Sequence, residues 1–108
     1  MTVQAPIHKR LKEARLAAGL SQKKLGIAAG IDEFVASARM NQYETGKHVP
    51  DYNMVQRIAR VLKLPAAFFY TLDNKQADFL KKYASLTENQ KLRLERIVEK
   101  MLKGQGGG

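Results

Sequence analysis

The sequence lacks cysteine and long apolar segments, and each absence excludes a class of protein. Without cysteine it forms no disulfide and offers no thiolate nucleophile or cysteine-ligated zinc site. Its apolar runs are short and interrupted by charges, so none spans a membrane. The N-terminal residues MTVQAPIHKR also lack the apolar segment of a secretory signal. We therefore expect a cytoplasmic protein with no membrane association.

Residues that would carry catalysis are also missing. The sequence shows no Ser/His/Asp set, no glycine-rich phosphate loop and no clustered pair of carboxylates. His8 and His48 have no acidic or cysteine partner at metal-ligand spacing. We therefore expect no enzyme, no cofactor and no metal site.

Acidic residues are few relative to basic ones. There are 19 Lys and Arg against 10 Asp and Glu, which gives a formal net charge of +9. Such an excess attracts polyanions by releasing their counterions, so nucleic acid is a candidate partner. A soluble basic domain without that partner would show the same excess, so charge alone leaves both interpretations open.

Strand-like alternation is absent as well, and apolar residues recur at helical spacing along 108 residues. A first helix is expected from Ile7 to a stop at Gly19. A second would begin after the cap Ser21, with Leu25 and Ala28 inward, and would end at Gly30. The fold class predicted is all-α.

The start of a third helix has two solutions. Either Asp32 caps it at once, or residues 32–35 (DEFV) form a bulged loop and the helix starts near Ala36 or Ser37. In both cases the helix closes at Gly46, with Met40 and Tyr43 as its inward residues.

Further helices follow in the second half of the chain. One starts near Asp51, and a short one starts near Pro65. A sixth would carry Ala77, Leu80 and Ala84, and Thr87 and Gln90 form a capping box for the last one. The predicted organisation is a flexible arm over 1–6, a core domain over 7–72, a helical extension over 73–103 and a flexible glycine tail over 104–108.

Three motifs in order indicate a family. The segments RLKEARLAAGLSQKKLGIAAG, YETGK and VQRIARVLKLPAAFFY resemble the lambda-repressor-like (Cro-type, XRE family) helix-turn-helix domain between Ile7 and Tyr70. The resemblance implies a five-helix domain, extended here by one or two C-terminal helices, that places its third helix in the DNA major groove. The segment from Gly30 to Glu44 is about one helical turn longer than usual in the family, so positions are counted back from Glu44.

The resemblance also assigns roles to individual residues. Gln22 would contact a phosphate and brace a base-reading side chain, and an exposed Ala38 would lie among the reading positions. Arginine suits guanine, whereas Asn and Gln suit adenine. The base-reading residues expected are Ser37, Arg39, Asn41, Gln42 and Gln22.

Other residues would hold the DNA backbone or the fold. The candidate phosphate contacts are Arg10, Lys23, Lys24, Tyr43 and Lys47, although such lysines are often only solvated and Tyr43 is equally well explained as a core residue. The resemblance implies that Arg15 and Glu44 form a partly buried ion pair with a structural role.

The last helix carries an apolar stripe whose role stays open. It would serve either as a homodimer surface or as a packing face against the preceding helix, and it consists of Leu94, Ile97, Val98, Met101 and Leu102. The function expected is a sequence-specific transcriptional regulator, of the (pro)phage-type or host repressor kind, that binds double-stranded DNA as a homodimer. The alternative is an antitoxin that binds a small protein partner and autoregulates its operon. A third interpretation is an RNA-binding or coactivator module.

Overall fold

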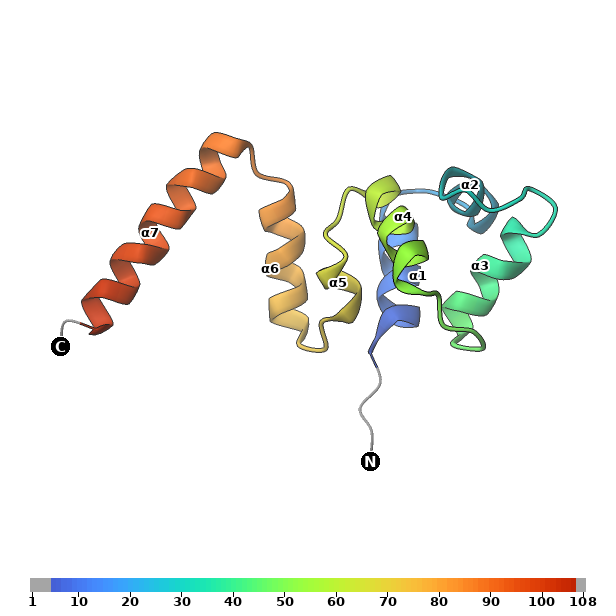
Figure 1. Cartoon of the computed structure of the whole chain (residues 1–108), viewed down its shortest axis with the longest axis horizontal. Coiled ribbons are helices and arrows are strands. Elements are labelled where there is room, and N and C mark those ends of the chain that lie inside the picture. Colours follow the sequence, from blue (N-terminus) through green and yellow to red (C-terminus); the bar gives the residue numbers. More distant parts are fainter. Residues whose placement is uncertain (1–4, 107–108) are drawn as a thin grey trace, which may run out of the picture.

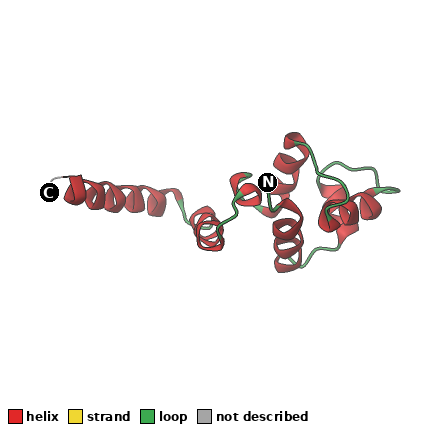
Figure 2. Cartoon of the chain, turned by 90° about the horizontal axis from the view of Figure 1, so that it is seen from below, coloured by secondary structure: helices red, strands yellow, loops and turns green. Residues whose placement is uncertain are grey.

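The computed structural model describes residues 5–106, and all regular structure in that range is helical (Figure 2). This confirms the all-α class. In chain order the helices are α1 (Ile7–Ala17), α2 (Gln22–Ala28), α3 (Ala36–Thr45), α4 (Tyr52–Leu62), α5 (Ala67–Tyr70), α6 (Asn74–Ala84) and α7 (Glu88–Gly106).

Local signals set most of the helix boundaries. The side chain of Ser21 accepts a hydrogen bond from the Lys24 N–H, and that of Asp51 accepts one from the Met54 N–H. Gly30 and Gly46 follow α2 and α3 with φ angles of +92° and +81°, a region that favours glycine. Thr87 and Gln90 form the predicted capping box, each side chain accepting from the other's backbone N–H at 3.2 Å and 2.9 Å.

The alternative starts of the third helix are resolved in favour of the loop. Residues 32–35 form a turn in which Asp32 Oδ1 accepts from the Phe34 N–H at 2.9 Å, and α3 begins at Ala36. One inward residue of α2 was predicted wrongly: Ala28 is exposed, and Ala29 is buried in its place. The turn over 32–35 leaves Phe34 89% exposed.

One core joins α1 to α6. Its largest fully buried side chains are Phe69, Leu11, Leu25, Met40, Ile58 and Val55. Ala77 of α6 is only 1% exposed and belongs to the same cluster. Helix α6, the first helix of the predicted extension over 73–103, therefore packs onto the helix-turn-helix core.

Helix α7 stands apart from this core as an arm (Figure 1). The radius of gyration is 16.6 Å, whereas a compact chain of this length has about 13 Å. The helix continues through Gly106, so residues 104–106 of the predicted flexible tail are helical. Residues 1–4 of the predicted arm, together with 107 and 108, lie outside the described range.

Candidate nucleic-acid interface

Helix α3 has one buried face and one exposed face. Ala36, Met40, Tyr43 and Glu44 point into the domain, at the i, i+4, i+7, i+8 spacing of a single helix side. The opposite side therefore faces solvent. Its exposed or half-buried residues are Ser37, Ala38, Arg39, Asn41 and Gln42.

Helices α2 and α3 approach each other closely at Gly26. A Cβ atom placed at residue 26 would lie 2.9 Å from the Cβ of Ala36 and 3.1 Å from its carbonyl oxygen. Only glycine allows this approach without displacing α3, which fixes the angle between the two helices. Gly26 could not be assigned this role from the sequence, because a glycine inside a helix carries no signal of what packs against it.

A bidentate ion pair anchors the C-terminal end of α3 to α1. Arg15 Nε donates to Glu44 Oε2 at 2.6 Å and Arg15 Nη2 donates to Glu44 Oε1 at 3.0 Å. The two side chains are 10% and 3% exposed. The hydrogen bond to Glu44 raises the pKa of Arg15, so the guanidinium stays charged. This is the structural pair that the family resemblance implied.

Gln22 lies where it can brace α3. Its amide nitrogen donates to Asn41 Oδ1 and to Glu44 Oε1, both at 3.2 Å. Asn41 therefore keeps both of its N–H donors for a further partner, and its side chain is held on the exposed face. The first residue of α2 and the outer face of α3 thus form one hydrogen-bonded surface.

Three predicted phosphate contacts are accessible near this surface. Lys23 and Lys24 lie on the first turn of α2, Lys47 directly follows the end of α3, and all three are exposed. Tyr43 is only 9% exposed and belongs to the core, which favours the core alternative for its ring.

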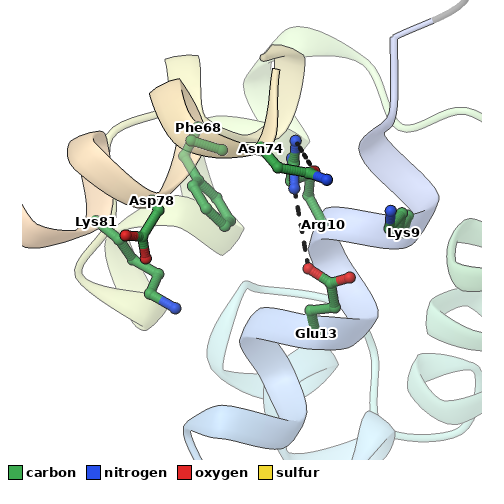
Figure 3. Close-up of a pocket in the computed structure, with 8 residues that line it drawn as sticks. Lys9, Arg10, Glu13, Phe68, Asn74, Asp78 and Lys81 are labelled. Carbon is green, nitrogen blue, oxygen red and sulfur yellow. Dashed lines mark hydrogen bonds and ion pairs between the residues drawn. The ribbon is translucent and has the colours of Figure 1, made fainter. Parts of the chain in front are cut away.

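Arg10 does not belong to this surface, and its predicted phosphate contact is wrong. It is 4% exposed, and its guanidinium donates to the carbonyl oxygens of Thr71 and Leu72 and to Asn74 Oδ1 at 2.8–3.1 Å. Figure 3 shows it beside Glu13 and Asn74, in the hollow between α1 and α6. Arg10 therefore ties the α5–α6 connection to α1.

The two histidines lie close together although 40 positions separate them in the sequence. His8 and His48 line one small hollow of about 40 Å³ beside Gly46. Within residues 5–106, no group of three His, Cys, Asp or Glu side chains has the geometry of a metal site. No helix in that range has the length and apolar character needed to cross a bilayer.

The short helices α2 and α3 pack on a helical core, and α3 turns a polar face outward. This arrangement defines the helix-turn-helix class, in which the second helix of the motif enters the DNA major groove. The family model described as "Helix-turn-helix domain" matches residues 9–67, so the chain belongs to the helix-turn-helix domain family.

The structure is also similar to the crystal structure of the transcriptional regulator BswR. The two share 45% sequence identity with a TM-score of 0.85, over 91% of this chain and 97% of that one. The similarity therefore extends beyond the helix-turn-helix match into the C-terminal helices. No curated protein matches the sequence significantly.

Proposed function

We propose that this protein is a sequence-specific transcriptional regulator of the lambda-repressor-like (XRE) type, which represses transcription by occupying its operator. The observation that carries the proposal is the outward face of α3, where the amide of Gln22 braces Asn41 and the Arg39 side chain is exposed. The net charge of +9 supplies attraction to the duplex, and the similar structure is that of a transcriptional regulator.

In this proposal α3 lies in the major groove, and Ser37, Arg39, Asn41 and Gln42 contact base edges. Arg39 would pair with guanine, and the two amides suit adenine. Lys23, Lys24 and Lys47 would hold phosphates on either side, which sets register without reading sequence. Since one small domain buries only about 600–1,000 Å² on DNA, two copies on a near-palindromic site would bind tightly enough.

Selection of bound sequences from a random duplex pool, followed by fluorescence anisotropy, tests the proposal. Arg39→Ala should reduce the preference for the selected site over a scrambled one by about 5- to 150-fold, as expected for one lost bidentate base contact. The matched control is Arg60→Ala, which removes the same charge from an exposed position on α4. If both variants keep the wild-type preference, α3 does not read the operator in this register.

Lys24→Ala separates phosphate contacts from base contacts. It should weaken binding to every duplex alike and lower the slope of log affinity against log salt by about one unit. Failure of the wild-type protein to select any duplex would instead favour an RNA-binding or coactivator role.

The second candidate function is an antitoxin that binds a small toxic protein and also autoregulates its operon. The observation in its favour is the uncovered apolar side of α7, where Ile97, Met101 and Leu102 are each more than half exposed. Formation of a stable complex with the product of an adjacent toxin gene would distinguish it from a stand-alone repressor.

A further inference from the structure

The turn between α2 and α3 holds an apolar side chain out in solvent. Phe34 is 89% exposed, the largest exposed fraction among the large apolar residues of the range 5–106. Scattered apolar residues are ordinary at a protein surface, so exposure alone does not indicate a contact. The turn is also the segment that makes the chain longer than usual between Gly30 and Glu44, so the reading positions of the family give it no role.

The hydrogen bonds of this turn hold Phe34 in place. Asp32 Oδ1 accepts from the Phe34 N–H at 2.9 Å, and the Asp32 carbonyl oxygen accepts from the Val35 N–H at 3.1 Å. Both ends of the turn are anchored in the core, since Ile31 is 5% exposed and Ala36 is fully buried. A ring on such a backbone loses little conformational freedom when it binds, which favours a contact role.

The turn lies next to the end of α3 that reads DNA in this fold class. Recognition helices contact base edges with their N-terminal residues. Phe34 lies two residues before the start of α3 at Ala36 and three before Ser37. The α2–α3 connection lies at the end of the molecule opposite α7, together with α3 (Figure 1). With α3 in the major groove, the turn therefore reaches the groove as well.

The charges of the turn limit which part of the duplex it can meet. Asp32 and Glu33 are both exposed, and their carboxylates are repelled by phosphates, so the turn does not rest on the DNA backbone. The base edges in the major groove differ from the backbone in two ways. They present amino donors on adenine and cytosine, which carboxylates accept, and they present one apolar group, the thymine methyl. An exposed phenylalanine between carboxylates matches those edges.

We propose that Phe34 is a specificity-determining residue that contacts the methyl group of a thymine, at the base pair beside the one that Ser37 contacts. The inference rests on the proposed function, because it requires α3 to lie in the major groove. It deepens that function by adding a preference for thymine that the polar residues of α3 do not supply.

Replacing each thymine of the selected duplex in turn by deoxyuridine tests the contact, because it removes one methyl group and keeps the base pair. At one position the wild-type affinity, measured by fluorescence anisotropy, should fall about fourfold, as expected for one methyl group that is no longer buried. Phe34→Ala should bind the unmodified site about 4- to 12-fold more weakly, as expected when about half of the ring is buried, and should not respond to deoxyuridine at that position.

Two controls separate this contact from folding and from general apolar binding. Because Phe34 packs little against the core, Phe34→Ala should leave the urea unfolding midpoint unchanged within error. Leu72→Ala removes a 57% exposed apolar side chain from the α5–α6 connection, and it should keep both the wild-type affinity and the response to deoxyuridine.

The inference is overturned if Phe34→Ala keeps the wild-type affinity, or if the variant responds to deoxyuridine as the wild type does at every thymine. Unchanged DNA binding would assign the ring to a protein partner instead. If Arg39→Ala still alters site preference in that case, only the role of Phe34 fails. If the wild-type protein selects no duplex, the proposed function fails together with it.

Discussion

The Arg15–Glu44 pair gives a quantitative test of how α3 is held. Glu44→Ala removes the acceptor of two charge-assisted hydrogen bonds, of 2.6 Å and 3.0 Å, and leaves the Arg15 guanidinium at a buried position. Breaking one side of a buried ion pair costs about 3–5 kcal/mol. Because small domains have only about 5–15 kcal/mol of stability, this loss should be plain in a denaturation curve.

A double-mutant cycle separates the pair from its surroundings. Arg15→Ala should also cost about 3–5 kcal/mol, whereas the double variant should cost less than the sum by roughly 1–3 kcal/mol, because no charge is then stranded. The measurement is urea unfolding followed by circular dichroism, at one fixed protein concentration so that any association contributes equally.

The control is an ion pair of similar length on the surface. Asp78 Oδ2 lies 2.9 Å from Lys82 Nζ, and the two side chains are 51% and 74% exposed. Asp78→Ala should leave the unfolding midpoint unchanged within error, because solvent screens the pair. The view that this pair anchors α3 would be refuted if the losses in unfolding free energy from the Arg15 and Glu44 variants were strictly additive. It would also be refuted if those losses were as small as that of the surface control.

Three further variants test other contacts. Gly26→Ala should lower the free energy of unfolding by about 1–2 kcal/mol, since the clash with Ala36 outweighs the gain in helix propensity, and urea unfolding measures it. Arg10→Ala should cost about 2–4 kcal/mol in the same assay yet leave the salt slope of DNA binding unchanged; a reduced slope would return Arg10 to the phosphate contacts. Thr87→Ala should lower the free energy of opening the first turn of α7 by about 1 kcal/mol, because it removes one hydrogen bond of the capping box. Amide hydrogen exchange in that turn should then be roughly fivefold faster. Unchanged exchange would mean that the capping box does not stabilise the start of α7.

Much of the helix-turn-helix unit could be predicted because its signals are local. The caps Ser21 and Asp51, the turn glycines Gly30 and Gly46 and the capping box at Thr87 each act within a few residues. The outward position of Asn41 followed from the reading positions that the family resemblance implied, counted back from Glu44.

The wrong predictions concern residues whose burial depends on packing against distant parts of the chain. Arg10 has the composition of a phosphate contact, but the carbonyl groups that engage it come from residues more than 60 positions away. Ala28 and Ala29 are equally apolar, and only the position of α2 on the core selects which of them is buried. No short-range pattern contains that information.

The sequence by itself determined the helical class and most helix boundaries, because hydrophobic period, caps and turn glycines act over one or two helical turns, and the family resemblance implied the candidate recognition residues. The tertiary structure alone decided that residues 32–35 form a turn, that Arg10 is buried, that α6 belongs to the core and that α7 stands away from it. Those outcomes depend on which distant surfaces meet, since burial is a property of the whole packed chain and not of any single segment.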